Sequence, residues 1–241
     1  MLKALILAAG FGSRLRPLTD DRPKALVPLG GRPVLDRTLD VLVEAGVKSV
    51  VVVTGYRRER LAAFLDTRRD VEATTVENPA YADTNTLASL LVAAPWVDDD
   101  FLLIDGDLVF EPAVLRPLLE PGTRLAVDRG RALDDDAVKI ALDGGHVSGV
   151  GKQLDAGLVA VAESIGIARI DRTSAAPLFA RGREILASSG TSGGRQAYYE
   201  AAFQRLIAGG HWFEVADVTG LRWVEIDDHD DLRRAETLFD R

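Results

Sequence analysis

A mainly apolar segment that runs straight into a glycine- and arginine-rich loop constrains this chain more than any other feature. Leu2–Leu7 has the composition of a buried first strand, and the loop that follows begins at Ala8. Gly10 and Gly12 allow a sharp turn that brings backbone N–H groups close to a bound anion. Arg14 and Lys24 can place positive charge on phosphoryl oxygens. The segment therefore predicts a phosphate-binding loop at the end of the first strand.

Two common phosphate loops do not fit this segment. A dinucleotide-binding loop needs a third glycine, and that position holds Leu15. A Walker loop needs Gly-Lys followed by Ser or Thr, and this tripeptide is absent from the chain. The remaining alternative is a glycine-rich turn with solvated arginines. However, the segment lies directly after a predicted strand and ends in Pro23-Lys24, and these two features favour phosphate binding.

The stretch from Leu7 to Leu26 resembles the signature of the nucleotidyltransferases that make NDP-sugars and CDP-alcohols. Their pattern is Leu-Ala-Ala-Gly-x-Gly-x-Arg-Leu-x-Pro-Leu-Thr, followed by Pro-Lys. The resemblance implies that Arg14 and Lys24 are catalytic and stabilise the transition state. It also implies that the triphosphate is wrapped by the preceding part of the loop, namely Leu7, Ala8, Ala9, Gly10, Gly12 and Ser13.

Composition narrows the class of protein. The chain has 241 residues, 47% hydrophobic and 27% charged, which is usual for a globular protein. Its net charge of −8 argues against a nucleic-acid surface. It has no cysteine, and its three histidines have no ligand spacing, so a zinc site is not expected. No apolar run can span a bilayer and no signal peptide is evident, so we expect a cytoplasmic protein without a membrane partner.

Helices and strands alternate in the first half of the sequence. We expect strands at 2–7, 47–54, 71–76 and 101–104, with helices at 33–46, 58–65 and 83–94. This order predicts an α/β, Rossmann-like fold with a mixed, mostly parallel central sheet flanked by helices. Ligands of such sheets bind at the carboxyl ends of the strands.

The second half has a different pattern, with more short strands. We expect a hairpin at 138–141 and 147–150, strands at 158–161, 165–170, 212–216 and 223–225, helices at 175–187, 195–208 and 229–239, and a flexible loop at 188–194. No linker divides the chain. We therefore expect one domain over 1–241, with an NTP-binding half at 1–120 and a smaller, β-rich acceptor-binding half at 121–241 that also supplies a metal ligand.

Two acidic segments follow apolar strands. Asp105-Gly106-Asp107 and Glu225-Ile226-Asp227-Asp228 each have carboxylates suited to Mg²⁺, although a turn or a helix cap explains them as well. The resemblance assigns Asp107 and Asp227 to one Mg²⁺ site and puts Asp105 and Gly106 beside the nucleotide.

A third segment, Asn78 to Leu90, contains polar residues at a predicted helix start. They are suited to capping that helix or to reading a base edge. The pattern Asn-Pro-x-Tyr-x-x-Thr-Asn-x-x-x-Ser-Leu resembles the cytidylyltransferase branch that uses phosphocholine, phosphonates or inositol phosphate. This resemblance implies that CTP is contacted by Tyr81, Thr84, Asn85, Thr86 and Ser89.

The acceptor is expected to bind in the second half. The resemblance implies that Lys152, in a Gly-Lys pair, aligns the acceptor phosphate as a third catalytic residue. The other candidates for a small anionic acceptor are Asp128, Lys139, Glu163, Ser164, Tyr198, Tyr199 and Glu200. Aromatic rings and a carboxylate are suited to a cationic head group, although Tyr198 and Tyr199 are equally suited to a core.

We therefore expect a Mg²⁺-dependent cytidylyltransferase that joins CTP to a small phosphomonoester or phosphonate and releases pyrophosphate. One alternative is a sugar- or cyclitol-1-phosphate nucleotidyltransferase that uses UTP, GTP or dTTP. Another is a nucleotide-sensing module without turnover. The sequence does not name the acceptor, and the resemblance also allows a homodimer.

Overall fold

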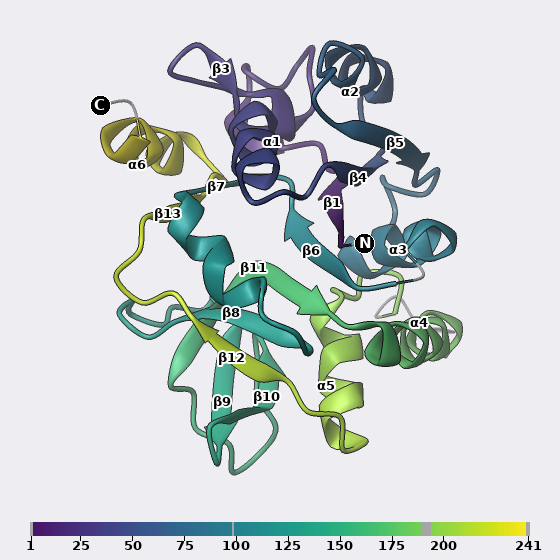
Figure 1. The fold of residues 1–241 in the computed structure, drawn as a ribbon, viewed down its shortest axis with the longest axis vertical. Helices are drawn as coiled ribbons and strands as arrows, with labels where there is room; N and C mark the ends of the chain where they lie inside the picture. The colour runs from purple at the N-terminus through teal and green to yellow at the C-terminus, as the bar shows by residue number, and fades with distance from the viewer. Residues whose placement is uncertain (1, 98, 189–193, 240–241) are drawn as a thin grey trace.

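A nine-stranded mixed sheet extends through both halves of the chain in the computed structural model, which describes residues 2–97, 99–188 and 194–239. The strand order is β5-β4-β1-β6-β11-β8-β12-β10-β9 (Figure 1). Of the flexible loop predicted at 188–194, residues 189–193 lie outside the described residues. The predicted mixed α/β fold is confirmed.

The first half forms the parallel part of the sheet. Its strands are β1 (Lys3–Ala8), β4 (Ser49–Thr54), β5 (Glu72–Glu77) and β6 (Phe101–Asp105), and β1 lies between β4 and β6. The crossover helices are α1 (Val34–Glu44), α2 (Arg58–Leu65) and α3 (Thr86–Ala93). Because these strands are parallel, the loops after β1, β4 and β6 meet at one edge of the sheet.

Antiparallel pairing dominates the second half. The strands β8 (Arg124–Asp128), β9 (Lys139–Asp143), β10 (His146–Gly151), β11 (Ala162–Ile170) and β12 (Glu214–Asp217) continue the sheet, and only β8 and β12 pair in parallel. The long strand β11 pairs with β6 and β8 and so joins the two halves.

Helices cover both faces of the sheet. One face carries α3, α4 (Arg172–Ala187) and α5 (Glu200–Ala208), which bury a core containing Leu87, Phe179 and Phe203 (Figure 1). The other face carries α1, α2 and a 3₁₀ segment, Pro112–Leu118, over a second core. The last helix, α6 (His229–Phe239), packs with the two-stranded ribbon of β7 (Leu108–Phe110) and β13 (Trp223–Glu225) in a third cluster.

Small elements complete the description. A two-stranded ribbon pairs β2 (Pro28–Leu29) with β3 (Arg32–Pro33), and short 3₁₀ turns lie at Ser13–Leu15, Lys24–Leu26 and Ala94–Trp96. Within the ranges that the structure describes, no helix combines the length and the apolar character needed to cross a bilayer.

Two predicted elements in the second half are wrong. Residues 158–161 do not form a strand, and β11 begins only at Ala162, because the side chains of Val159 and Val161 are exposed. The helix predicted from Arg195 begins at Glu200. The backbone before it is held by α3, since Asn85 N donates to Arg195 O and Leu87 N to Ala197 O. The pairing of β13 with β7 brings the second acidic segment back to the first, and Ile226 N donates to Asp107 O.

Candidate active site

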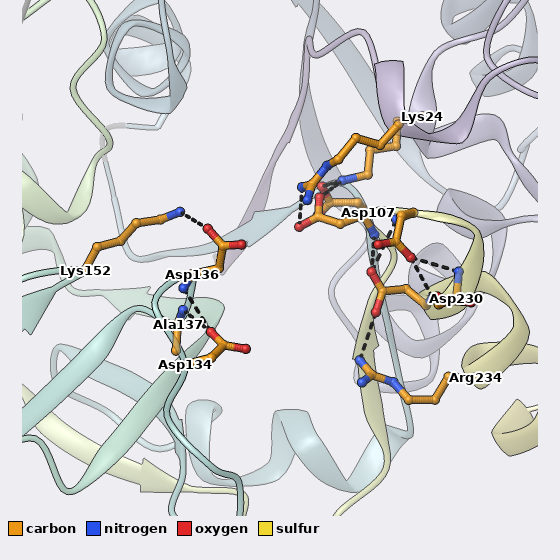
Figure 2. A network of polar contacts seen from close by, with 12 residues as sticks. Lys24, Asp107, Asp134, Asp136, Ala137, Lys152, Asp230 and Arg234 are labelled. Carbon is orange, nitrogen blue, oxygen red and sulfur yellow. Dashed lines mark hydrogen bonds and ion pairs between the residues drawn. The ribbon is translucent and has the colours of Figure 1, made fainter.

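A cavity of about 860 Å³ opens along the carboxyl edge of the parallel strands. Residues from both halves line it, including the glycine loop, the start of α3, the segment 131–138, β11 and β13. In Figure 2, Lys152 and Asp136 lie across this cavity from Lys24 and Asp107. The cavity therefore has two groups of charged side chains on opposite walls, one around Lys24 and Asp107 and one around Lys152 and Asp136.

Gly12 positions the end of the glycine loop. Its φ of +62° is in the left-handed region, and a Cβ atom there would lie 2.9 Å from Cβ of Lys24. The loop is closed by Thr19, whose hydroxyl donates to Gly12 O at 2.8 Å. Gly12 is therefore needed to pack Lys24 against the loop, while Gly10 lines the cavity itself.

The Lys24 ammonium lies between two carboxylates that are far away in the sequence. Nζ is 2.6 Å from Asp107 Oδ2 and 2.5 Å from Asp227 Oδ1. Arg14 joins the cluster, with Nη2 2.9 Å from the other Asp227 oxygen. Burial would raise the pKa of Asp227, but the charges of Lys24 and Arg14 hold it below its usual value. Burial would lower the pKa of Lys24, and the two carboxylates raise it instead.

The same cluster has the donor set of a divalent-cation site. Carboxylate oxygens of Asp107, Glu225 and Asp227 all lie within 4.8 Å of one another. Oδ1 of Asp107 is buried and has no hydrogen-bond partner in the described part of the chain. Glu225 is exposed to the cavity, yet loss of hydration there and the charges of Asp107 and Asp227 raise its pKa to about 8. Three carboxylates that lie close together, one of them with an oxygen that lacks a hydrogen-bond partner, are suited to bind a hard divalent cation such as Mg²⁺.

The start of α3 presents polar groups to the cavity. Asn85 caps this helix, since its Oδ1 accepts from Thr86 N at 2.9 Å. Asn78 lies behind it and donates from Nδ2 to the hydroxyls of Thr84 and Ser89. The capping role is thus observed, and Thr84, Asn85, Thr86, Ser89 and Tyr81 also line the cavity.

Lys152 lies on the opposite wall. Its Nζ is 3.3 Å from Asp136 Oδ1 and 5.4 Å from the centre of the Tyr198 ring. Asp136 belongs to a short loop that Asp134 organises by accepting from the backbone N–H groups of Asp136 and Ala137 (Figure 2). This ammonium therefore faces the cavity from a wall that is separate from the Lys24 cluster.

The floor near α5 is acidic. Glu200 is 7% exposed and its Oε2 has no hydrogen-bond partner among the described residues. Burial raises the pKa of Glu200 to about 7. Asp105 accepts a hydrogen bond from the hydroxyl of Tyr199 at 2.9 Å. Burial and the nearby charges of Asp107, Glu200 and Glu225 raise the pKa of Asp105.

A guanidinium group spans the wall next to β13. Arg131 lies over the Trp223 ring, 3.6 Å from its centre, and donates to Trp223 O at 2.7 Å. Its Nε is 3.7 Å from both Asp128 Oδ2 and Glu163 Oε1. Burial raises the pKa of Glu163 in spite of this arginine. Trp223 in turn donates from Nε1 to Asp128 at 2.8 Å, so Asp128 supports the wall from behind.

Comparison with known proteins assigns the chain to a family. Residues 4–186 match the model of the MobA-like NTP transferase domain. The chain belongs to this family. The nucleotidyltransferase is 36% identical over 243 residues to CMP-5'-(3-aminopropyl)phosphonate synthase of Streptomyces rubellomurinus, an alignment that covers 99% of this chain and 39% of that protein. The chain thus spans about two-fifths of the length of this relative.

Two solved structures share the fold of this nucleotidyltransferase. The inositol-1-phosphate CTP transferase from T. maritima has a TM-score of 0.81 at 22% identity, with 98% of this chain and 94% of that chain covered. CTP:phosphocholine cytidylyltransferase from Streptococcus pneumoniae has a TM-score of 0.78 at 23% identity, with 98% of each chain covered. The resemblance seen in the sequence is confirmed.

Most of the predicted site residues of the nucleotidyltransferase line the cavity. They are Leu7, Ala9, Gly10, Arg14, Tyr81, Thr84, Asn85, Thr86, Ser89, Asp105, Asp107, Lys152, Glu163, Ser164, Tyr198, Tyr199, Glu200 and Asp227. The others, which lie behind or beside it, are Ala8, Gly12, Ser13, Lys24, Gly106, Asp128 and Lys139. Lys139 fits its predicted acceptor-binding role least, because its Nζ donates to the backbone oxygens of Asp134 and Lys152.

Sequence reasoning missed several cavity residues. Arg131, Trp223 and Arg234 carry no recognisable motif, and only the structure brings them to the cavity. Asp134 and Asp136 are visible in the sequence as an acidic run at 134–136, but nothing in that run distinguishes it from other solvated carboxylates.

Proposed function

We propose that this nucleotidyltransferase transfers the cytidylyl group of CTP to a small phosphomonoester or phosphonate. An oxygen of the acceptor attacks the α-phosphorus of CTP and forms a new P–O bond. The bond between that phosphorus and the oxygen bridging to the β-phosphorus breaks, and pyrophosphate leaves with the bonding electrons. Such a reaction needs positioning and charge neutralisation rather than a covalent enzyme intermediate.

The observation that carries the proposal is the meeting of Lys24, Asp107 and Asp227 at the end of β1. Nζ of Lys24 is 2.6 Å from Asp107 and 2.5 Å from Asp227, although the three residues come from the beginning, the middle and the end of the chain. A lysine held between two carboxylates can turn toward a phosphate when a divalent cation takes over those carboxylates. The cluster therefore supports a triphosphate site rather than a purely structural ion pair.

In this proposal the first half, 1–120, binds CTP. The glycine loop surrounds the triphosphate, and Arg14 and Lys24 neutralise the charge that grows on the phosphoryl oxygens. The base lies against the polar start of α3, where Thr84 and Asn85 line the cavity. These groups supply both donors and acceptors to a base edge.

Mg²⁺ is the cation that we propose for the carboxylate cluster. Asp107 and Asp227 would hold it, and Glu225 lies close enough to assist directly or through water. When bound, Mg²⁺ neutralises the phosphates and makes the α-phosphorus more electrophilic.

The second half, 121–241, binds the acceptor in this proposal. Lys152 faces the cavity from its own wall, and its ammonium is suited to hold the acceptor phosphoryl oxygens opposite the Lys24 cluster. The separation of the two groups of cations supports two anionic substrates in one cavity. Two structural neighbours are named for CTP, and one relative is named for the synthesis of a CMP-phosphonate, which supports the choice of nucleotide and acceptor class.

A pyrophosphate-release screen tests the proposal. The full chain with Mg²⁺ is given CTP, UTP, GTP or dTTP together with phosphocholine, 2-aminoethylphosphonate, 3-aminopropylphosphonate or inositol phosphate. We expect release with CTP and at least one of these acceptors. Release with UTP, GTP or dTTP but not with CTP would assign the sugar- or cyclitol-phosphate activity instead. Tight NTP binding without release from any pair would indicate a nucleotide-sensing module.

A further inference from the structure

One residue beside the glycine loop has a backbone conformation that residues with side chains seldom adopt. Arg57 lies between β4 and α2 (Figure 1), and its φ of +50° is in the left-handed region. Among the described residues, every other positive φ belongs to a glycine. Strain of this kind persists only where surrounding contacts hold it, and it is concentrated at functional sites. The contacts of Arg57 and of its neighbour Tyr56 therefore indicate what this segment does.

Tyr56 and Arg57 contact the glycine loop at two points. The hydroxyl of Tyr56 donates to Asp20 O at 2.9 Å, and Nη2 of Arg57 donates to the same oxygen at 3.0 Å. The backbone N of Tyr56 donates to Ala9 O at 3.1 Å. Ala9 directly follows β1, and Asp20 lies shortly before Lys24. The short segment after β4 is therefore bonded to the loop near its beginning and near its end.

The hydrogen bonds to Asp20 restrain the part of the loop that we expect to contact phosphate. Thr19, which precedes Asp20, is buried and donates from its hydroxyl to Gly12 O at 2.8 Å. Gly12 packs closely on Lys24, since a Cβ atom at Gly12 would lie 2.9 Å from Cβ of Lys24. A displacement of Asp20 would therefore also displace Thr19, Gly12 and the Lys24 side chain.

Three aromatic rings join the same segment to the tip of the loop. Phe11 is 38% exposed, and its ring centre is 5.1 Å from that of Tyr56 and 5.2 Å from that of Tyr81. Tyr81 lies against Gly55, where a Cβ atom would be 2.6 Å from Cγ of the tyrosine. Since Tyr81 also lines the cavity, these rings connect the glycine loop to the side of the cavity where we expect the base.

Resting on the proposed function, we infer that Tyr56 and Arg57 are positioning residues that hold the glycine loop in the shape that receives the triphosphate of CTP. Neither is among the residues that line the cavity, so both act through the loop rather than by contact with the nucleotide. A loop with two glycines has many accessible conformations when it is unrestrained. Restraining it before the nucleotide binds lowers the entropy that binding must remove, and this gain appears in the affinity.

Two variants remove the donors to Asp20 O while keeping the rest of the segment. Tyr56→Phe deletes only the hydroxyl, and Arg57→Gly deletes the guanidinium at a position whose φ glycine adopts freely. Each should raise the dissociation constant for CTP with Mg²⁺ roughly 3- to 10-fold, the effect of one hydrogen bond. Tripolyphosphate, which has the phosphates without the base, should lose affinity by the same factor, whereas CMP should bind as it does to the wild type. Isothermal titration calorimetry measures all three.

Stability and kinetics separate positioning from a merely structural role. Urea unfolding should show Arg57→Gly at least as stable as the wild type, because glycine relieves the strained φ. In turnover with the best acceptor, KM for CTP should rise by the same roughly 3- to 10-fold, whereas kcat and KM for the acceptor should stay unchanged. Lower affinity for the triphosphate at undiminished stability is the result expected when preorganisation is lost.

Two further substitutions serve as controls. Arg57→Lys keeps N–H donors on a long side chain and should restore part of the affinity. Arg60→Gln removes a nearby positive charge at an exposed position of α2 and should bind tripolyphosphate as the wild type does. An unchanged dissociation constant for tripolyphosphate in a folded double variant, Tyr56→Phe with Arg57→Gly, would overturn the inference. An equal loss of affinity for CMP and for tripolyphosphate would overturn it too.

The binding measurements distinguish this inference from the proposed function. If the wild type releases pyrophosphate from CTP and the double variant binds CTP and tripolyphosphate equally well, only the inference is wrong. If the wild type binds neither CTP nor tripolyphosphate, the proposed function is wrong and the inference falls with it. If the double variant binds both ligands more weakly but no acceptor releases pyrophosphate, the positioning role stands and only the transfer reaction is wrong.

Discussion

Lys24 and Asp227 are separated by 203 positions in the sequence, and their Nζ and Oδ1 atoms are 2.5 Å apart. The contact joins the loop after the first strand to the segment before the last helix. Asp107 accepts a hydrogen bond from the same ammonium and belongs to a third segment. The ammonium of Lys24 therefore contacts all three segments that form this edge of the cavity.

The first prediction concerns the ammonium itself. Lys24→Ala removes a positive charge that the developing charge on the phosphoryl oxygens requires. We expect kcat to fall roughly 100- to 1,000-fold with the best nucleotide, the loss typical of one preorganised donor. Steady-state pyrophosphate release checks this, with Lys48→Ala, an exposed lysine, as the control. Turnover near the wild-type level in Lys24→Ala would rule out the proposed mechanism.

The second prediction concerns the metal. Activity should be lost in EDTA and return when Mg²⁺ is added in excess. Asp107→Asn and Asp227→Asn should each raise the Mg²⁺ concentration for half-maximal activity at least roughly tenfold, since even groups that only support a ligand have effects of that size. Asp143→Asn, at an exposed position of β9, should behave as the wild type. A Mg²⁺ titration that neither variant shifts would place the metal elsewhere.

How much of this site was predictable depends on whether its signals are local. The glycine loop is a contiguous motif, so the sequence located it at the end of a strand. The prediction that Asp107 and Asp227 lie close together came from the resemblance, because no local sequence pattern indicates that these two segments meet. Arg131 was not predictable, since its position over Trp223 depends on strand pairing between distant segments.

The same reasoning explains the errors in secondary structure. The helix predicted from Arg195 is helical only from Glu200, because its first residues pair with the start of α3. The apolar residues Val159 and Val161 have the composition of a strand, yet tertiary packing leaves them exposed. In both cases a local preference is overridden by tertiary structure that the sequence does not display.

The third prediction concerns the pH dependence of stability. The folded protein raises the pKa of Glu200 to about 7 from an ordinary value of 4.5. Between these values the folded state holds a proton that the unfolded state has lost, so stability falls as the pH rises through this window. The cost of the ionised group reaches about 3 kcal/mol at most above pH 7, at 1.36 kcal/mol for each unit of pKa.

Glu200→Gln removes this cost. Urea unfolding at pH 5 and pH 8 should show the variant gaining stability relative to the wild type as the pH rises. Glu59→Gln should give a difference that is independent of pH, because this side chain is exposed. A flat difference for Glu200→Gln would mean that Glu200 is hydrated or paired with a cation in solution.

The fourth prediction concerns Gly166, in the middle of β11. Its φ is +79°, and a Cβ atom there would lie 2.6 Å from Asp105 Oδ2, the oxygen that accepts from Tyr199. Gly145 has a similar φ of +86° with nothing within 4 Å of a Cβ atom. Each alanine carries about 1–2 kcal/mol of backbone strain, and only Gly166→Ala adds about 1–3 kcal/mol of overpacking.

Comparing the two alanine variants therefore isolates the contact with Asp105. By urea unfolding, Gly166→Ala should be less stable than Gly145→Ala, since the backbone term is shared and the steric term is not. The displaced Asp105 carboxylate, which is expected beside the nucleotide, should also raise KM for CTP in Gly166→Ala and leave KM unchanged in Gly145→Ala. Equal stability and equal KM in the two variants would mean that Asp105 moves freely, which its hydrogen bond to Tyr199 argues against.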